Sequence, residues 1–252
     1  MNAQLQEASA PSRRPSNEAA IRETFGVVEL RQYTLHPGRR EELINLFDAE
    51  FVETQEASGM TVLGQFRDLD DPDRFVWLRA FADMDSRREA LNQFYGGPVW
   101  RQHRDAANAT MIDSDNVLLL RPGQDIASSG MALPPRLEDE ADDSRIVIGL
   151  HYFDAPVSED WLSHFEQIQR PWLEDLRAQV LATLVSEYAD NDFPALPVRS
   201  GEHVFACVLR FASEADHERC DRQLQASWHI GSQPRRHELL RLAPTSRSRL
   251  GR

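Results

Sequence analysis

The hydrophobic and polar positions along this chain follow one pattern twice. Each copy begins with an apolar run, at 27–35 and again at 146–153, followed by a segment whose apolar residues recur at helical spacing. A later apolar run, at 74–82 and again at 202–212, precedes a second helical segment that leads to a tryptophan in both copies. The pattern therefore predicts two copies of one structural unit.

The first copy predicts the order strand, helix, strand, strand, helix, strand. Leu43 and Phe47 belong to the apolar stripe of the first helix, and Gly59 provides its C-terminal stop. A turn is expected at 70–73, where three Asp surround a Pro. This order is that of a ferredoxin-like unit, a four-stranded antiparallel sheet with two helices on one face. We expect strands at 27–35, 60–68, 74–82 and 116–120, and helical segments at 39–59, 87–95 and 99–109.

The predicted sheet of the first copy is apolar on both faces. Phe75 and Trp77 alternate with Val76 and Leu78 along one strand. Helices cover only one face, so the other needs a second layer, which the second copy supplies. The fold class we expect is α+β, with two ferredoxin-like βαββαβ units forming an intramolecular pseudo-dimer. In the second copy we expect strands at 146–153, 181–188, 204–211 and 239–242, a helix interrupted at Pro171, and a helix at 214–224.

Composition divides the chain into four parts. Residues 1–24 are rich in Ala, Ser, Gln, Arg and Pro and lack the apolar centre of a signal peptide, so we expect a disordered arm. The first domain is expected at 25–122 and the second, diverged domain at 145–245. Residues 123–144 contain Pro, Gly and an acidic run and are expected to form a solvated linker.

Charge and cysteine content limit the partners and the compartment. The chain has 252 residues and a net charge of -13, which argues against binding a nucleic acid. Every fixed positive side chain is an arginine, because the sequence contains no lysine. Only two cysteines are present, Cys207 and Cys220, and no apolar run is long enough to span a membrane. We expect a cytoplasmic protein without nucleic-acid or membrane partners.

One set of candidate functional residues lies on the predicted helix 99–109. Trp100, His103, Arg104 and Asn108 share a helix face by their spacing. Trp100 would supply an apolar wall, His103 a base or donor, Arg104 an anion clamp and Asn108 an orienting amide. The alternative is that Arg104 forms a surface ion pair, Trp100 belongs to the core and Asn108 bonds to backbone.

A second set lies on two neighbouring strands. Arg31 and Tyr33 share one face of the first strand, and Trp77 and Arg79 share one face of the third. A tyrosine and arginines against an aromatic wall would suit a planar, oxygenated or acidic ligand, with Tyr33 as a further catalytic candidate. The alternative is that these four side chains pack the interface between the two sheets.

The remaining histidines show no spacing typical of a metal site. His151, His164 and His203 are not arranged as ligand pairs with each other or with carboxylates, so we expect no metal. A haem held by one axial histidine leaves no spacing signature and stays open as an alternative. The sequence also lacks a glycine-rich phosphate loop and a Gly-x-Ser-x-Gly nucleophile motif.

Two blocks of the first copy resemble the NIPSNAP family. They are residues 28–35 followed by Pro37 and Gly38, and residues 98–108 followed by 116–122. The second copy keeps the strand pattern but loses the His-Arg-Asp-x-x-Asn block of the first. The resemblance implies a dimeric α/β-barrel fold, in which two sheets face each other.

That barrel superfamily includes cofactor-free oxygenases, haem enzymes, isomerases and dehydratases, so the fold alone does not select a reaction. The function we expect is a cofactor-independent enzyme, a metal-free monooxygenase, isomerase, cyclase or dehydratase. It would act on a small aromatic or polyketide-like molecule by acid/base chemistry in an apolar pocket. The alternatives are a non-catalytic small-molecule-binding or protein-interaction protein and a haem-dependent enzyme. As partners we expect a small-molecule ligand, and as assembly a monomeric pseudo-dimer or a homodimer.

Overall fold

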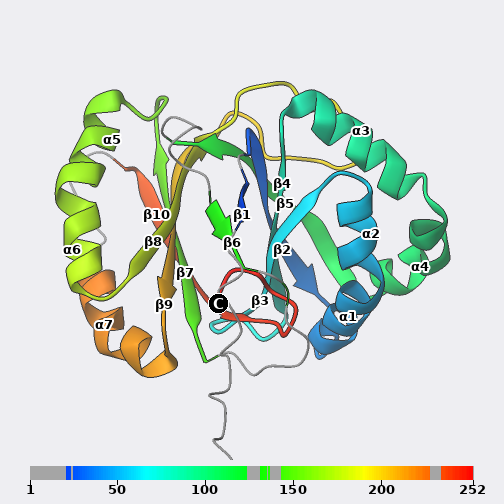
Figure 1. Cartoon of the computed structure of the whole chain (residues 1–252), viewed down its shortest axis with the longest axis horizontal. Coiled ribbons are helices and arrows are strands. Elements are labelled where there is room, and N and C mark those ends of the chain that lie inside the picture. Colours follow the sequence, from blue (N-terminus) through cyan, green and yellow to red (C-terminus); the bar gives the residue numbers. More distant parts are fainter. Residues whose placement is uncertain are drawn as a thin grey trace, which may run out of the picture.

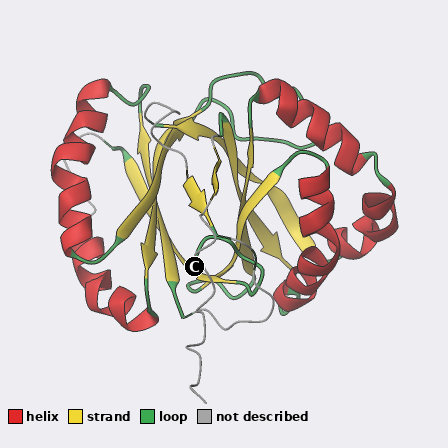
Figure 2. Ribbon diagram, viewed as in Figure 1, coloured by secondary structure: helices red, strands yellow, loops and turns green. Residues whose placement is uncertain are grey.

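The protein is an α+β fold in which eight strands close into one barrel and the helices lie outside it (Figure 1). The computed structural model describes residues 21–23, 25–123, 131–134, 136, 143–227 and 234–251. Figure 2 shows the helices in two groups, on opposite sides of the strands. One group comes from the first half of the chain and the other from the second half.

In the first half, identifiable residues start the two later helices. Asp83 caps the second helix region by accepting a hydrogen bond from Ser86 N at 2.7 Å, and Pro98 starts the following helix, where its missing N–H costs nothing. The predicted strand at 27–35 is confirmed. The strands are β2 (Val27–Leu35), β3 (Thr61–Asp68), β4 (Arg74–Phe81) and β5 (Met111–Pro122), and the helices are α1 (Arg40–Leu46), the π-helix η1 (Phe47–Phe51), α2 (Val52–Ala57), α3 (Met84–Tyr95) and α4 (Pro98–Asn108).

The second half follows the same order. Ser158 caps its first helix by accepting a hydrogen bond from Trp161 N at 3.2 Å. The prediction that Pro171 interrupts the helix is wrong, because this proline lies in the first turn after a π-helix, where the helical path continues. The elements are β7 (Arg145–Phe153), α5 (Glu159–His164), the π-helix η2 (Phe165–Gln169), α6 (Arg170–Asp175), β8 (Gln179–Ser186), β9 (His203–Phe211), α7 (Glu214–Ser227) and β10 (Arg236–Pro244).

The two halves are joined along both edges of their sheets. The strand order around the barrel is β10-β3-β4-β2-β5-β8-β9-β7, and neighbouring strands are antiparallel. At one junction Leu120 of β5 pairs with Ser186 of β8, and at the other Leu242 of β10 pairs with Asp68 of β3. The sheets thus face each other, as expected, and in addition join along both edges into a closed barrel.

Side chains alternate between the barrel interior and the helix-covered outside. Along β2, Val28 and Leu30 belong to the interior cluster, whereas Val27 and Tyr33 pack with the helices. Each half therefore has a helix-facing core of its own, and the halves share the interior. The buried interior residues include Phe66, Val76, Leu78, Leu118, Leu120, Ile146, Ile148, Leu150, Tyr152, Val204, Val208, Leu240 and Leu242.

Two short strands lie in segments for which the sequence predicted no structure. β1 (Ile21–Glu23) pairs in antiparallel register with β6 (Met131–Leu133), so the predicted disordered arm 1–24 and linker 123–144 are wrong at these positions. The pairing satisfies backbone groups of both strands. The rest of the arm and most of the linker lie outside the described residues. Among the described residues, no helix is long and apolar enough to cross a membrane.

The end of the chain contributes to the barrel interior. Leu250 is 3% exposed within the interior cluster, and its N–H donates to Leu63 O of β3 at 3.0 Å. Ser248 Oγ accepts a hydrogen bond from Gln65 N at 3.3 Å and donates to Leu250 O at 2.7 Å. Figure 1 shows this terminal segment (red) close to β6, where Arg249 Nε donates to Pro134 O at 2.9 Å.

We predict that Leu250→Ala lowers the free energy of unfolding by about 2–4 kcal/mol, because it removes a buried side chain and leaves a cavity. Urea denaturation followed by circular dichroism measures the change. Leu69→Ala is the matched control, since Leu69 is 47% exposed. Equal losses for the two variants would contradict the burial of the terminal segment.

Candidate functional site

Four charged side chains form a buried cluster between the first sheet and its helices. Strand register places Glu29 opposite Arg79. Glu29 Oε2 accepts hydrogen bonds from Arg31 Nη1 at 2.7 Å and from Arg79 Nε at 2.8 Å, and Oε1 accepts from Arg87 Nε at 2.7 Å. Gln55 Oε1 accepts a further bond from Arg79 at 3.1 Å. The four charged side chains are at most 1% exposed, so the cluster is shielded from water.

The cluster has an excess of positive charge. Burial raises the pKa of Glu29, but the charges of Arg79, Arg31 and Arg87 outweigh it and hold that pKa far below its usual range. Glu29 is therefore ionised, yet it is one carboxylate among three guanidinium groups. The second half supplies a second carboxylate, that of Asp192, whose Oδ1 lies 2.7 Å from Arg87 Nη1. One positive charge remains unbalanced by these partners.

Tyr33 extends the cluster towards an aromatic region. Its hydroxyl oxygen accepts a hydrogen bond from Arg31 Nε at 2.9 Å. Burial raises the pKa of Tyr33, while Arg31 opposes the change, so the hydroxyl keeps its proton at neutral pH. The indole Nε1 of neighbouring Trp77 is buried and has no acceptor among the described residues. The Tyr33 proton is not used in its bond with Arg31, so both side chains have a donor available for a ligand.

These two residues line a small cavity between the first sheet and the helices. Its volume is about 30 Å³, comparable to the space of one water molecule. Phe47 of η1 lies against Trp77 with ring centroids 4.8 Å apart, and Tyr95 lies 4.8 Å from Trp100. The π-helix presents Phe47 and Phe51 to the same space, a use of π-turns that is frequent at functional sites. The cavity is lined by Tyr33, Leu43, Phe47, Phe51, Gln55, Trp77, Phe94, Tyr95, Trp100, Ala107 and Met111.

The arrangement suits an oxygen atom that carries negative charge on a planar organic molecule. Aromatic walls bury the ring of such a ligand, and neutral donors beside a fixed guanidinium stabilise its oxygen. The cavity accepts only a small group as it stands. A larger ligand requires Tyr95 or Trp100 to move outward, and both are partly exposed.

The structure brings together one predicted set of site residues. Arg31, Tyr33, Trp77 and Arg79 meet on the outer face of the first sheet, and Trp100 joins them from α4. The alternative, in which the four pack between the two sheets, is wrong. Their side chains face the helices, because the interior positions of β2 and β4 belong to the alternate residues.

The structure does not bring the other predicted residues into the cavity wall. His103 is 21% exposed at the edge of α4, with Nε2 3.6 Å from Glu50 Oε2. Arg104 is 55% exposed beside Asp105, and Asn108 is exposed. The buried stripe of α4 passes through Trp100 and Ala107, so positions 104 and 108 turn towards solvent. The catalytic roles of His103 and Arg104 gain no support from this geometry.

Three residues of the cluster were not predicted from the sequence. Glu29 gave a signal, since it alternates with Arg31 inside an apolar strand and must share its outer face. Arg87 gave no such signal, because its helix carries several charged residues and nothing in the sequence distinguishes Arg87 from the others. Asp192 comes from a loop of the second half, and no local pattern relates it to the first.

The second half lacks the charged cluster. In both halves the sequence Phe-Ala, followed by a capping residue, precedes the helix α3 or α7, and this match aligns the two halves. The strand register then places Val147, Gly149 and Leu209 at the positions that Glu29, Arg31 and Arg79 occupy in the first half. His151, at the position equivalent to Tyr33, packs against Trp161 at 5.5 Å. Among the residues that the structure describes, the combination of aromatic walls and a buried ionic cluster therefore occurs in the first half alone.

The histidines considered as ligands lie in different surroundings. His203 Nδ1 lies 2.9 Å from the hydroxyl of exposed Tyr188, whereas His164 ends α5. In the part of the chain that the structure describes, no three His, Cys, Asp or Glu side chains gather as a metal site would require. Cys207 is fully buried and Cys220 nearly so, and they are not joined to each other.

These features define a barrel with two unequal halves and one charged, aromatic site in the first. Residues 28–125 match the model of the NIPSNAP family, which confirms the resemblance predicted from the sequence for this part of the chain. A search of curated proteins finds no match to the chain.

Solved structures share the fold over most of the chain. A proposed monooxygenase from Lactobacillus acidophilus NCFM has a TM-score of 0.54 at 9% identity, covering 87% of this chain and 94% of that one. A proposed monooxygenase from Fusobacterium nucleatum has a TM-score of 0.53 at 8% identity, covering 90% and 96%. A NIPSNAP family protein from Agrobacterium tumefaciens matches 39% of this chain and 93% of its own, with 20% identity and a TM-score of 0.37. At these identities, the first two similarities establish a common fold.

We predict that Glu29→Gln lowers the free energy of unfolding at pH 7 by about 3–5 kcal/mol, because it leaves buried arginines without their carboxylate. The folded-state pKa of Glu29 is lowered. Its stabilising contribution is therefore present above the unfolded-state pKa of about 4.3 and is lost as the pH falls further. Urea denaturation between pH 3 and 7 should accordingly show a steeper loss below about pH 4 for the wild type than for the variant.

The control is Glu41→Gln, which removes an exposed partner of Arg67. It should cost much less, since an exposed ion pair contributes little. A Glu29→Gln protein as stable as this control would contradict the account of the cluster.

Proposed function

We propose that the first half binds a small planar organic molecule through an oxygen atom and stabilises that oxygen as a phenolate or enolate, without a metal. The observation that carries the proposal is the pair of buried donors, Tyr33 and Trp77, in the wall of an aromatic cavity beside Arg31. A buried donor without an acceptor costs free energy, and a ligand oxygen would recover it.

The chemistry follows from the protonation states of these groups. Tyr33 keeps its proton and can donate a hydrogen bond to an oxygen that gains charge. Arg31 stays charged and lies against both Tyr33 and Trp77, at 5.5 and 5.6 Å from their ring centroids. Stabilised phenolates and enolates are intermediates that metal-free monooxygenases, isomerases, cyclases and dehydratases have in common, so the enzyme classes expected from the sequence share this step.

A binding protein without turnover is the second candidate. It is favoured by the cavity lining, which contains no carboxylate and no imidazole to act as a base. The same lining argues against the expected haem alternative, in which one histidine would be the axial ligand, because it includes no histidine.

The fold is part of the proposal. We infer that the chain is a pair of ferredoxin-like units, near 25–122 and 145–245, that descend from one unit by duplication. The closed barrel lets them act as a monomeric pseudo-dimer, since each half covers the other half's inner sheet face. A cytoplasmic location is kept as part of this proposal, in line with the cysteine content of the chain.

We predict that bound 2-naphthol ionises at a pH at least about one unit lower than free 2-naphthol, because the site favours the naphtholate. Absorbance titration at saturating protein concentration measures this shift. Tyr33→Phe should remove most of it by deleting one donor, whereas Arg104→Ala, on the exposed side of α4, should retain it.

Naphthalene, which has no oxygen, should bind equally to the wild type and to Tyr33→Phe. An unshifted titration of bound 2-naphthol, or a shift that survives in Tyr33→Phe, would overturn the proposal. Mass spectrometry of the same samples separates the candidates, because an enzyme would form a product and a binding protein would not.

A further inference from the structure

A loop of the second half lies across the first half. Residues 187–202 connect β8 to β9. This loop is much longer than the equivalent connection between β3 and β4, which consists of residues 69–73. Glu187 N donates to Leu119 O at 2.9 Å and Arg199 N donates to Val117 O at 2.8 Å, so both ends of the loop are fixed to β5. Figure 1 shows the loop (yellow) reaching towards α3.

An ion pair anchors the middle of this loop to the buried cluster. Arg87 Nη1 donates to Asp192 Oδ1 at 2.7 Å and to Asn191 Oδ1 at 3.2 Å. The Arg87 side chain is fully buried and that of Asp192 is 20% exposed. A charge pair shielded to this degree holds its geometry better than a surface pair. Arg87 Nε donates to Glu29 within the cluster, so Arg87 connects the loop directly to the site.

The next residue of the loop contacts the cavity wall. The Phe193 ring lies 5.9 Å from the ring of Tyr95, and Phe193 packs against the helix-facing core of the first half together with Leu196. Tyr95 in turn lies 4.8 Å from Trp100, and both line the cavity. Tyr95 thus contacts both Trp100 of the cavity wall and Phe193 of the loop, so a displacement of Tyr95 changes its packing against Phe193.

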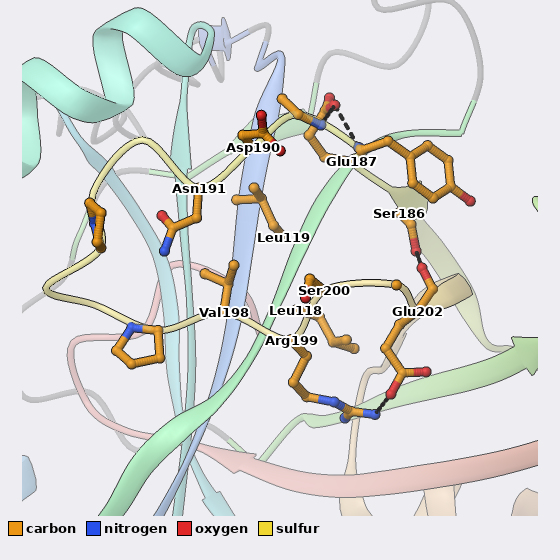
Figure 3. Close-up of a pocket in the computed structure, with 15 residues that line it drawn as sticks. Leu118, Leu119, Ser186, Glu187, Asp190, Asn191, Val198, Arg199, Ser200 and Glu202 are labelled. Atoms are coloured by element: carbon orange, nitrogen blue, oxygen red, sulfur yellow. Dashed lines mark hydrogen bonds and ion pairs between the residues drawn. The ribbon is translucent and has the colours of Figure 1, made fainter.

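The loop has unfilled space beside it. It borders a hollow of about 540 Å³, and Figure 3 shows Asn191, Val198 and Ser200 of the loop around this hollow, with Leu118 and Leu119 of β5. The volume of this hollow lies within the range of about 300–1,000 Å³ that is typical of small-molecule sites, whereas the aromatic cavity is far smaller. The loop side chains that border this hollow, such as Asn191 and Val198, can therefore be displaced into it without overpacking their surroundings.

We propose that Phe193 determines the size of the ligand that the first half accepts, by holding Tyr95 against the cavity, and that Asp192 keeps the loop in place through Arg87. The second half is then a part of the site. Phe193 is a specificity-determining residue and Asp192 a positioning residue. The inference rests on the proposed function, because it concerns the ligands of the same site.

We predict that Phe193→Ala raises the affinity for 2-anthrol, relative to that for phenol, by at least about fivefold, because the space that it opens admits an additional ring. Fluorescence titrations with phenol, 2-naphthol and 2-anthrol give the ratio of dissociation constants. Val198→Ala is the matched control. It truncates an apolar side chain of the same loop that borders the hollow and not the aromatic core, and it should change the ratio less than about twofold.

The anchor is tested without a ligand by hydrogen–deuterium exchange. Asp192→Asn should speed exchange of amides in the loop and in α3 by about tenfold, with the β7 amides unchanged as the reference. Asp190→Asn, an exposed charge removal two residues earlier in the same loop, should leave both segments unchanged.

The outcomes separate this inference from the proposed function. Absence of phenol and 2-naphthol binding by the wild type would overturn both. Binding by the wild type, with the same ligand ratio in Phe193→Ala as in Val198→Ala, would overturn the role of Phe193 alone. Equal exchange in Asp192→Asn and Asp190→Asn would overturn the role of Asp192.

Discussion

The whole structure depends on sheets that are apolar on both faces. A four-stranded sheet with helices on one side still exposes Val28, Leu30, Val76 and Leu78 on the other. The hydrophobic effect makes that exposure unfavourable, and a second sheet of the same kind removes it. Antiparallel pairing of β5 with β8 and of β10 with β3 then closes the barrel and fixes the mutual position of the halves. That fixed position is what allows a loop of one half to reach the site of the other.

The site joins two kinds of interaction that usually occur apart. Glu29 and three arginines form a buried ionic cluster, which is costly unless every partner is present. Next to it, Phe47, Trp77 and Trp100 form an aromatic wall. Tyr33 belongs to both, because its oxygen contacts Arg31 and its ring contacts Trp77 at 6.0 Å. Under the proposed function, the strongly charged side would stabilise charge on a ligand oxygen and the aromatic side would bury the rest of the ligand.

Much of the fold could be predicted from the sequence, because periodicity reports directly on which face of an element is buried. The strand at 27–35 and the order of elements came from that signal, as did the shared face of Arg31, Tyr33, Trp77 and Arg79. Spacing alone placed His103 and Arg104 on the same face as Trp100, but it could not show how α4 is rotated against the sheet. The contact of Asp192 with Arg87 joins residues 105 positions apart, and no local pattern encodes it.

The covalent connection of the two halves changes what a single substitution can do. In a symmetric homodimer, any mutation appears in both subunits, so a change that removed an arginine from one site would remove it from the other. Here the position equivalent to Arg31 is Gly149, and the first half keeps its guanidinium. The second half has a long loop between β8 and β9, whereas the first half has a short connection and holds the charged cluster. Asymmetry of this kind is open to a fused chain and closed to an assembly of identical subunits.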